Sequence, residues 1–510
     1  MDPDAKHHRI GRQHLISSEH TIMSALAVVV GLAGGMGAVG FRYLINFVQV
    51  LAYGSEADLI EILPSMAWSI KVWVPAAGGL IVGPLVYFWA REAKGHGVPE
   101  VMEAVALKGG IIRKRIVVIK SLASAICIGT GGAVGREGPI VQIGSAIGSI
   151  IGQIIKISAD RMRTLVGCGA AAGIAATFNA PIAGSMFALE LILADFGLAT
   201  FSPIVISAVV ATAVSRHYLG DFPAFIVPAY ELVSAWYTLL SLTFLKILAS
   251  AVTIGSGGSG GIFAPSLFIG AMAGGFFGMT VHSFWPGITA SPGAYGIVGM
   301  GAVVAATTHG PLTAILMLFE MTGDYKIILP LMITCIISAL AAGQLYRESI
   351  YTLKLTRRGV DIRAGREVNV LKSIPVQDVM NTQVETIYEG TPLGGFSQTI
   401  ARSKYNSFPV LDADNRLVGI ISFADYRDAV FNEDLKDLVV AKDLATTDVR
   451  TIAMEANLFE ALEAISYKDF AILPVVAADD DRRLMGVVSR RDILGAYDKA
   501  VLKKFLFSRP

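Results

Sequence analysis

The segment IGTGGAVGREGPIVQIGSA, residues Ile128–Ala146, returns later in the chain as IGSGGSGGIFAPSLFIGA, residues Ile254–Ala271. At one constant offset of 126 residues, glycine meets glycine at five positions and Pro139 meets Pro265. Both segments are glycine-rich turns that lead into apolar helical sequence. Glycine-interrupted segments at corresponding places in two halves of a membrane protein indicate a transport site. The repeat therefore bears on both the architecture and the chemistry of the chain.

A second pair of segments extends the repeat. Gly169–Glu190 matches Gly299–Glu320 at an offset of 130 residues, in the same order along the chain. Two separate matches predict a membrane domain built of two related halves, about residues 21–220 and 230–355. Many of its apolar runs are interrupted by glycine or proline, which predicts broken helices whose exposed backbone is buried in protein or lines a polar cavity.

The composition separates a membrane part from a soluble part. The 510 residues are 53% hydrophobic and 16% charged, with a mean hydropathy of +0.59, which is too apolar for an ordinary soluble protein. No Asp, Glu, Lys or Arg occurs from Ile247 to Phe319, whereas the chain after about Arg357 is rich in all four. We expect a cytoplasmic N-terminal segment, a transmembrane domain, a linker and two small soluble modules, at residues 1–20, 21–355, 356–374, 375–440 and 441–500.

Charge and cysteine content indicate which partners and which cellular location to expect. Basic clusters at Lys6–Arg12 and Arg357–Arg358 flank the membrane part and predict that both termini are cytoplasmic in a multi-pass protein of the cell membrane. The net charge is +1 and the chain has no long basic run, so we expect no nucleic-acid partner. Three cysteines lie in apolar segments without metal-ligand spacing, which indicates packing residues: Cys127, Cys168 and Cys335.

The glycine turns suit an anion. A glycine run before a helix leaves backbone N–H groups free to face one point, and the helix dipole favours negative charge there. Such a site needs no buried cation. Glu137 lies in the first turn, between Gly135 and Pro139, where an acidic side chain is costly and usually functional. Its carboxylate can compete with the anion for the same donors and swing away when protonated, which predicts a gate linked to protons.

Three motifs now identify a family resemblance. GHGVP (Gly95–Pro99), GREGP (Gly135–Pro139) and GIFAP (Gly261–Pro265) resemble, in order, the signature segments of CLC chloride channels and transporters. The resemblance implies a homodimer in the lipid bilayer, with one chloride pathway per subunit, inverted repeats and chloride held at helix N-termini. It further implies that Glu137 is the gating glutamate and that the anion is bound by His96, Gly97, Arg136, Gly261, Ile262, Phe263 and Tyr351. Tyr346 is the alternative to the last of these.

Two positions depart from the family pattern. His96 stands where a serine usually contacts chloride, and its ring either donates to the anion or points outside while the backbone faces inward. Many proton-coupled members have two adjacent glutamates in the segment matching Phe187–Ile192. Here Glu190 matches the first and Leu191 takes the place of the second, which relays protons. Because the repeat sets Glu190 opposite Glu320, we expect both carboxylates to bond helix backbone.

The soluble part has a repeat of its own. Phe408–Asp428 is echoed by Leu473–Leu494, each reading as strand, polar turn, strand and a Ser-x-x-Asp step into a helix. The pattern resembles a tandem pair of CBS modules, an α/β fold that often binds adenine nucleotides. The resemblance implies that Tyr405 and Asn406 contact adenine and that Asp492 binds the ribose. The alternative is an empty pair that serves as a dimer interface.

We therefore predict an all-α polytopic membrane protein with two inverted halves, followed by a cytoplasmic CBS pair. Its expected function is gated transport of chloride or a similar anion, regulated by the CBS pair, with no enzymatic activity and no required cofactor or metal. Leu191 favours a channel, and a chloride/proton antiporter is the alternative. A CBS-containing cation transporter is the rival class, but the charge-free stretch from Ile247 to Phe319 argues against it. A membrane enzyme is a third class.

Overall fold

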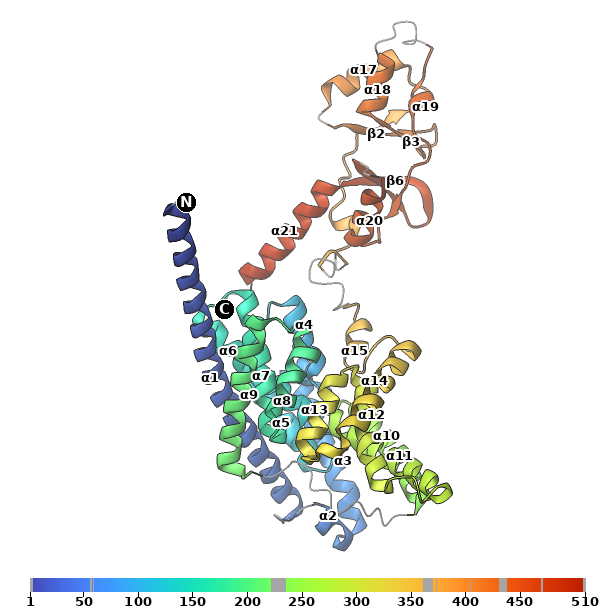
Figure 1. Cartoon of the computed structure of the whole chain (residues 1–510). Helices are drawn as coiled ribbons and strands as arrows, with labels where there is room; N and C mark the ends of the chain where they lie inside the picture. The colour runs from blue at the N-terminus through green and yellow to red at the C-terminus, as the bar shows by residue number, and fades with distance from the viewer. Residues whose placement is uncertain are drawn as a thin grey trace. The chain divides into compact units, whose positions relative to one another are not determined.

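The computed structural model describes residues 3–507 apart from 56, 58, 222–234, 361–369, 373, 404, 431–437 and 469–470. The chain forms two compact units, Met1–Ile362 and Arg363–Pro510. The named elements of the first unit are all helices, and the second unit contains helices and two small sheets (Figure 1). The predicted fold class, a helical membrane domain with broken helices followed by an α/β CBS pair, is confirmed.

Helices of the membrane unit fall into two sets that follow one another along the chain. The first set is α1 (Pro3–Tyr53), α2 (Leu59–Ile62), α3 (Trp68–Trp89), α4 (Val98–Leu107), α5 (Arg115–Gly129), α6 (Glu137–Ile155), α7 (Ala159–Phe178), α8 (Pro181–Phe187) with a π-helical turn (Ala188–Leu193), and α9 (Leu198–Leu219). The second set is α10 (Trp236–Gly255), α11 (Phe263–Phe284), α12 (Pro292–Thr308), α13 (Pro311–Thr322), α14 (Ile328–Leu345) and α15 (Thr352–Thr356).

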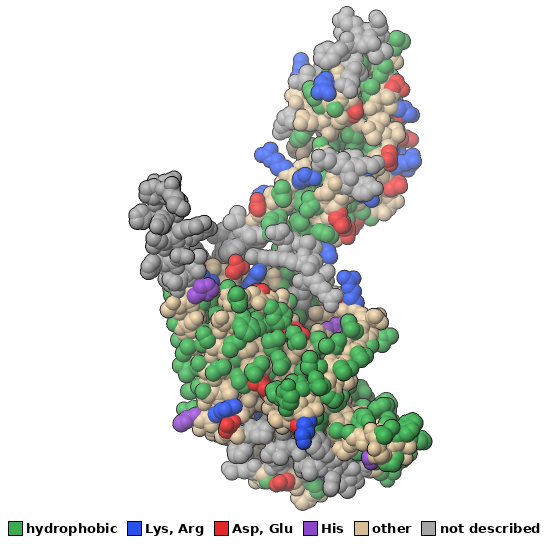
Figure 2. All heavy atoms as spheres, viewed as in Figure 1, with side chains coloured by type: hydrophobic (Ala, Val, Ile, Leu, Met, Phe, Trp, Pro, Cys, Tyr) green, Lys and Arg blue, Asp and Glu red, His purple; other side chains and the backbone are tan. Residues whose placement is uncertain are grey.

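Seven of the described helices are long and apolar enough to cross a membrane. Two shorter apolar helices, Pro181–Leu193 and Pro311–Thr322, occupy equivalent places in the two sets. Each begins at a proline, which is well tolerated in the first turn, where an N–H has no intrahelical partner. Hydrophobic side chains cover much of the visible face of the membrane unit (Figure 2), as expected for a surface in contact with lipid.

Reciprocal hydrogen bonds relate the two sets by a local two-fold axis. Gly135 N donates to Gly261 O at 2.8 Å, and Gly261 N donates to Gly135 O at 2.6 Å. These glycines are equivalent in the repeat, 126 residues apart, and they exchange both backbone bonds as a narrow antiparallel pair does. Two equivalent residues can bond each other in this mutual way only at the axis that relates them. The predicted inverted halves therefore meet at their signature turns.

The two halves are unequal in content. Helices α5 to α9 have counterparts in α10 to α14, whereas α1, α3 and α4 have no counterpart among the described residues; only residues 220–235 separate α9 from α10. A methyl group at Gly129 would meet Val48 and Ile45 of α1, whereas one at the equivalent Gly255 would meet nothing within 4 Å. Accordingly, 67% of the residues in the most apolar 18-residue stretch of α6 are buried. The value for the same stretch of its counterpart α11 is only 33%.

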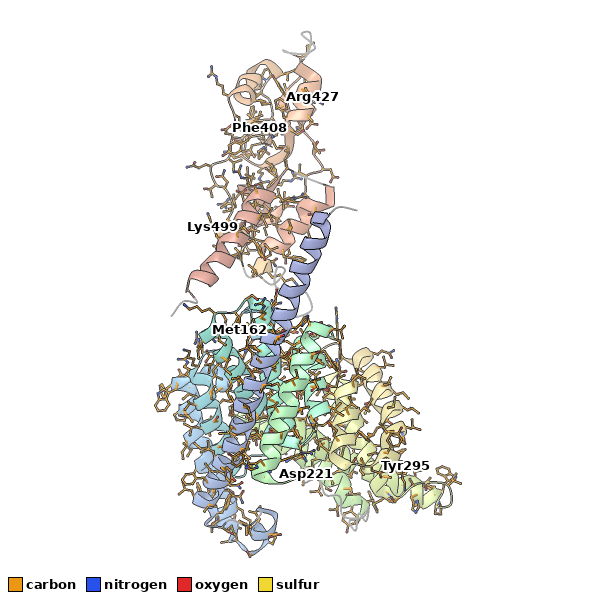
Figure 3. All side chains as sticks on the ribbon, turned by 60° about the vertical axis from the view of Figure 1, so that its left-hand side comes forward. Met162, Asp221, Tyr295, Phe408, Arg427 and Lys499 are labelled. Carbon is orange, nitrogen blue, oxygen red and sulfur yellow. The ribbon has the colours of Figure 1, made fainter. Side chains whose placement is uncertain are left out.

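The C-terminal unit contains two similar modules. In the first, β1 (Ile387–Tyr388) pairs in parallel with β2 (Ser407–Leu411), which pairs antiparallel with β3 (Leu417–Ser422); the helices are α17 (Leu393–Arg402), α18 (Phe423–Val430) and α19 (Ala441–Leu444). The second repeats this order with β4 (Ile452–Ala453), β5 (Ile472–Ala477) and β6 (Asp480–Ser489), beside α20 (Leu458–Lys468) and α21 (Arg490–Phe507). Phe408 is buried in the first module (Figure 3). The predicted strand–turn–strand–helix repeat is confirmed.

Candidate functional site

Three glycine turns meet backbone to backbone in the membrane unit. Gly95 N donates to Gly258 O at 3.2 Å, which joins the first signature turn to the third. The second and third turns are joined by the mutual bonds of Gly135 and Gly261. Gly138 packs against the carbonyl oxygen of His96, and a methyl group at Gly138 would also lie 3.1 Å from the Cα of Gly261. Glycine at these positions lets three chain segments share one small space.

The helices that start at these turns have uncapped N-termini. Helices α4, α6 and α11 are preceded by Gly97, Arg136 and Ile262, and none of these three makes a side-chain capping hydrogen bond. Gly97 has a φ of 85°, a conformation that favours glycine. The first N–H groups of each helix therefore keep their donor capacity, and the helix dipoles add partial positive charge at the same place. This arrangement can hold an anion, as the sequence predicts.

The carboxyl group of Glu137 lies within this space. Glu137 is the first residue of α6 and is buried, and its carboxyl lies against the backbone of Gly135 and Gly261. Its Oε2 atom would lie 2.8 Å from a methyl group built on Gly261, and among the described residues it has no hydrogen-bond partner. The carboxyl group thus lies between the signature turns of the two halves.

Two aromatic side chains complete the buried site. The His96 ring is 7% exposed, and its centroid lies 5.7 Å from that of Tyr351. Within the described part of the chain, His96 Nδ1 has no hydrogen-bond partner. Tyr351 is 2% exposed and close enough to Glu137 to interact electrostatically with it, whereas Tyr346 is 56% exposed. The His96 side chain is therefore buried beside Tyr351, whereas Tyr346 is exposed.

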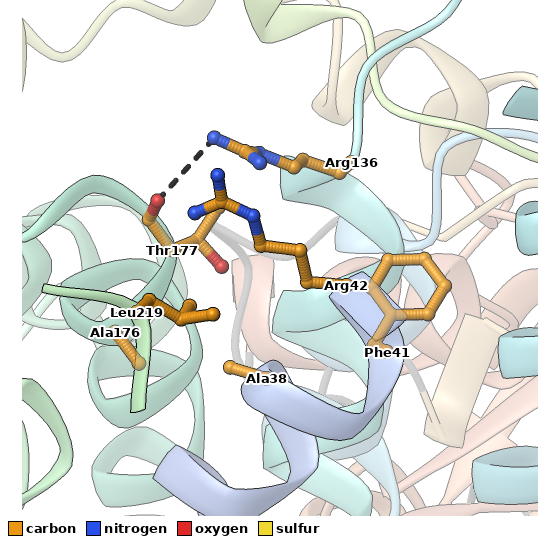
Figure 4. Close-up of a pocket in the computed structure, with 7 residues that line it drawn as sticks. All are labelled: Ala38, Phe41, Arg42, Arg136, Ala176, Thr177 and Leu219. Atoms are coloured by element: carbon orange, nitrogen blue, oxygen red, sulfur yellow. Dashed lines mark hydrogen bonds between the residues drawn. The ribbon is translucent and has the colours of Figure 1, made fainter. Parts of the chain in front are cut away.

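Of the remaining predicted anion ligands, two lie at the start of α11 and one points away from the glycine turns. Ile262 and Phe263 are buried at the start of α11, and the Phe263 ring lies 6.0 Å from that of Phe178. The side chain of Arg136 takes a different direction. Its Nη2 donates to Thr177 O at 3.5 Å, and the guanidinium lines a separate pocket that also contains Arg42 (Figure 4). Arg136 is thus placed beside the site rather than within it.

An ion-pair cluster supports the tyrosine side of the site. Lys354, three residues after Tyr351, has its Nζ 2.6 Å from Glu100 Oε1 in α4, and it also donates to Lys94 O at 3.1 Å. Arg358 Nη1 lies 3.5 Å from the same Glu100 oxygen. These contacts join α15 to the helix that carries the first signature turn, which fixes Tyr351 relative to His96.

Lys120 is a buried cation that the sequence interpretation missed. It is fully buried in α5, and its Nζ donates to Ala93 O at 3.0 Å and to Gly95 O at 2.7 Å. The lysine thus satisfies carbonyl groups behind the first signature turn, and does not itself cap the N-termini in front of it. The expectation that the site needs no buried cation overlooked this support, although a single lysine in an apolar helix is a recognised functional signal.

We predict that Lys120→Met destabilises the membrane unit and weakens anion transport. Methionine retains the apolar stem but removes two charge-assisted hydrogen bonds, each worth about 1.5–3 kcal/mol. The loss is expected as a lower unfolding temperature in detergent together with slower chloride flux in liposomes. The exposed Lys71→Met is the matched control, since it removes a lysine from α3 without removing a buried contact. Equal behaviour of the two variants would contradict the supporting role.

Glu190 and Glu320 cap each other's halves. Glu190 accepts from Leu312 N and Thr313 N, at 3.1 and 2.7 Å, at the start of α13. Glu320 accepts from Ile182 N and Ala183 N, at 3.1 and 2.6 Å, at the start of α8. Donors and acceptors correspond at the repeat offset of 130 residues. The expected helix-bonding role is confirmed, and the exchange is a second mutual contact about the two-fold axis.

Replacement of Glu190 by alanine is expected to destabilise the contact between the halves. Loss of an N-terminal cap costs about 0.5–2 kcal/mol. Thermal unfolding in detergent should therefore shift to a lower temperature. Glu320→Ala should behave in the same way because it is the symmetry equivalent. An unchanged unfolding temperature in both variants would contradict the capping role.

The predicted nucleotide ligands lie in the C-terminal unit. Tyr405 Oη accepts from Asn381 Nδ2 at 3.3 Å, and Asn381 exchanges backbone bonds with Val487 of the second module. Asn406 O accepts from Phe423 N at the start of α18. Asp492 Oδ2 accepts from Ser489 N and Oγ, at 3.0 and 2.6 Å. The predicted Ser-x-x-Asp step is confirmed, and Asp492 has this local bonding role whether or not it binds a ribose.

Comparisons with known proteins agree with this geometry. The family described as voltage gated chloride channel matches residues 78–240 and 229–343, and CBS domains match residues 376–432 and 441–499. A putative chloride channel protein ClcB-like from Ralstonia nicotianae is 31% identical over 406 residues, covering 64% of this chain and 95% of that protein. An H(+)/Cl(-) exchange transporter ClcA from Vibrio campbellii is 29% identical over 407 residues, covering 63% and 86%.

Solved structures show the same fold. A slow cyanobacterial Cl⁻/H⁺ antiporter is similar with a TM-score of 0.58 and 25% identity, covering 66% of this chain and 97% of that one. A eukaryotic CLC transporter has a TM-score of 0.55 at 18% identity and covers 92% of this chain, which supports the fold alone.

The family match spans residues 78–343 in two overlapping parts, which is more than half of the 510 residues. The signature motifs, their order and their contacts are retained, so the chain belongs to the CLC family of voltage-gated chloride channels and transporters and carries a CBS domain pair.

Proposed function

We propose that this protein exchanges chloride for protons across a membrane, with Glu137 as the shared gate. The observation that carries the proposal is the carboxyl group of Glu137 at the N-terminus of α11, in the space between the two halves. A chloride ion and this carboxylate would compete for the same N–H donors. Protonation removes the negative charge of the carboxyl, which frees the donors for chloride and gives proton binding a direct effect on anion binding.

Relatives favour exchange over the channel that Leu191 suggests. Several similar proteins are named H(+)/Cl(-) exchange transporters, and one similar structure is described as a slow cyanobacterial Cl⁻/H⁺ antiporter. Others, including the Ralstonia protein, are named as channels. Leu191 cannot relay protons, and it packs against Gly310 beside Glu190. We therefore propose that protons reach Glu137 from the inner side along water rather than through a second glutamate.

We also propose how the anion is held. The N–H groups at the starts of α4, α6 and α11 supply donors, including those of Gly97, Ile262 and Phe263. The His96 ring and the Tyr351 hydroxyl face the inner part of the site. Two buried polar atoms without partners in the described residues, His96 Nδ1 and Glu137 Oε2, support a ligand at this place, because unpaired buried polar atoms are uncommon in native structures.

Proton uptake driven by a chloride gradient tests the exchange. Liposomes that contain the purified protein and a high chloride concentration, diluted into low chloride, should take up protons although no proton gradient is imposed. An uncoupler should abolish that uptake. Chloride flux with no proton movement would show that the protein is a channel rather than an exchanger. Absence of any chloride flux from folded protein would overturn anion transport altogether.

The CBS pair is proposed as a regulatory domain that binds an adenine nucleotide. Tyr405, Asn406 and Asp492 would contact the adenine and ribose, and the link from Tyr405 through Asn381 to β6 supports a ligand position between the modules. Titration calorimetry of the full chain with ATP, ADP and AMP tests this. Binding that is lost in Tyr405→Ala supports the proposal, and no binding of any of the three favours an empty pair that acts as an interface.

A homodimer with cytoplasmic termini is proposed for the assembly. The short helices α8 and α13 expose Ile182 and Leu312, which are equivalent in the repeat, so the halves present a matched apolar face to a second copy. The mass of the detergent-solubilised protein tests the dimer, and protease protection in sealed vesicles tests the side on which the termini lie.

A further inference from the structure

Unpaired buried polar atoms gather around the first signature turn. Among the described residues, six buried side-chain nitrogen or oxygen atoms have no hydrogen-bond partner. Four of them belong to residues in this turn or beside it, namely Glu92, His96, Glu100 and Gln142, and a fifth belongs to Glu137. Gln142 of α6 reaches the turn, since its Oε1 would lie 2.8 Å from a methyl group on Gly97. Buried polar atoms normally bind a polar group or an ordered water, so this side of the Glu137 site is suited to the passage of protons.

His96 is the titratable side chain of this group that lies next to the gate. Its side chain is buried, and its ring centroid lies 5.7 Å from that of Tyr351, which interacts electrostatically with Glu137. The backbone of His96 is held beside the same residue, because its carbonyl oxygen packs against Gly138. A neutral imidazole has one nitrogen that donates a proton and one that accepts it. The turn thus places a group that can pass protons beside Glu137.

Glu100 lies on the other side of this histidine in the chain, in the first turn of α4. Its side chain is 9% exposed, and its Oε1 atom takes both ion-pair partners, Lys354 and Arg358, at 2.6 and 3.5 Å. The Oε2 atom is buried and has no hydrogen-bond partner among the described residues. The Arg358 side chain is 47% exposed and lies four residues before the membrane unit ends at Ile362. Glu100 therefore lies toward the side on which the chain leaves the membrane unit.

The carboxylate beside Leu191 is bound differently. Glu190 Oε1 accepts from Leu312 N, and Oε2 accepts from the backbone N–H and the hydroxyl of Thr313. Both of its oxygens are therefore engaged in capping α13, whereas Glu100 and Glu137 each keep one unpaired buried oxygen. Glu100 is thus the better placed of the two carboxylates to exchange a proton with the site.

We propose that His96 relays protons between Glu100 and Glu137. The proposal rests on chloride/proton exchange and adds the route by which protons reach the gate. The imidazole takes up a proton from the Glu100 side at one ring nitrogen and releases the proton bound to the other nitrogen toward Glu137. One proton thus reaches the Glu137 carboxylate for each proton taken up, and the ring stays neutral overall. Rotation of the ring restores the first tautomer and completes the cycle.

The charges around His96 favour transfer of a proton over its storage. Three cations, Lys120, Lys354 and Arg358, act electrostatically on the ring. Nearby positive charge and burial both disfavour a lasting imidazolium. A proton that enters the ring therefore leaves it again, and the carboxylate of Glu137 is the anionic acceptor at the gate.

The test measures the ratio of proton uptake to chloride efflux in liposomes with an outward chloride gradient. Asparagine keeps an N–H group that can donate to an anion, but its amide does not take up protons near neutral pH. The ratio should fall about tenfold or more in His96→Asn, because a positioned proton-transfer group contributes a factor of about 100 or more and water replaces only part of it. His96→Ser is a second variant without the imidazole and should show the same fall. Glu100→Gln should also lower the ratio.

Two matched controls separate the relay from a general loss of histidine or carboxylate. His282→Asn changes a histidine 19 residues after the start of α11, about 28 Å along the helix. Glu103→Gln changes the other α4 carboxylate that pairs with Arg358. Both should keep the wild-type ratio, and an equal fall in either control rejects the relay.

The wild-type measurement distinguishes failure of the relay from failure of exchange. Exchange by the wild type with an unchanged ratio in His96→Asn and His96→Ser overturns the relay and leaves exchange standing. Chloride flux without proton movement in the wild type overturns exchange and the relay together.

Discussion

Replacement of Glu137 by alanine is expected to uncouple chloride movement from proton movement. Proton uptake driven by a chloride gradient should fall about 100-fold or more, because a positioned proton-transfer group contributes a factor of this size and no other described carboxyl lies at this place. Chloride flux should persist and lose its dependence on pH. The liposome assay measures proton uptake and chloride flux in the same preparation, so the loss of proton uptake and the persistence of chloride flux can be compared directly.

The same replacement is expected to leave the fold intact. Glu137 Oε2 is buried without a hydrogen-bond partner among the described residues, and an unpaired buried polar atom costs about 1–3 kcal/mol. Alanine removes that cost, so the unfolding temperature in detergent should stay equal or rise. Glu103→Ala, which removes a partly exposed carboxylate of α4, is the matched control and should retain coupling. Persistent proton uptake in Glu137→Ala would assign the gate to another residue.

The sequence predicted the part of the site that depends on local pattern. Glycines at a constant offset predicted two turns, and the structure joins Gly135 to Gly261 by mutual backbone bonds. Glu190 and Glu320 were likewise expected to bond helix backbone, and each caps the other half. These features could be predicted because residues that match in the two halves of the sequence are related by the two-fold axis and therefore take equivalent positions in the structure.

Features without a repeat could not be predicted in this way. Lys120 is separated by 25 residues from Gly95, and only the packing of α5 behind the turn brings its ammonium group to that carbonyl. The sequence left two orientations possible for the His96 ring, because local sequence does not determine whether a side chain next to glycine points inward. The inequality of the halves could not be predicted because the matching segments begin at Ile128 and include none of the helices α1 to α4.

The second large effect is expected from Gly138→Ala. A methyl group there would coincide with the carbonyl oxygen of His96 and would lie 3.1 Å from the Cα of Gly261. Both neighbours are backbone atoms, so no side chain can rotate to make room. Overpacking of this kind costs about 1–3 kcal/mol, and displacement of the three turns by about 1 Å should reduce chloride flux by roughly 100-fold. Flux in liposomes and thermal unfolding in detergent measure the two losses.

Gly255→Ala is the matched control, because a methyl group at Gly255 meets nothing within 4 Å. It should keep wild-type flux and stability. The residue equivalent to Gly138 in the second half is Ala264, so the repeat itself accepts alanine at this place. The turn before α4 packs against Gly138, and among the described residues the second half has no counterpart of α4. Normal flux in Gly138→Ala would mean that the three turns do not meet as closely as their backbone contacts indicate, and with it the shared anion site would lose its geometric basis.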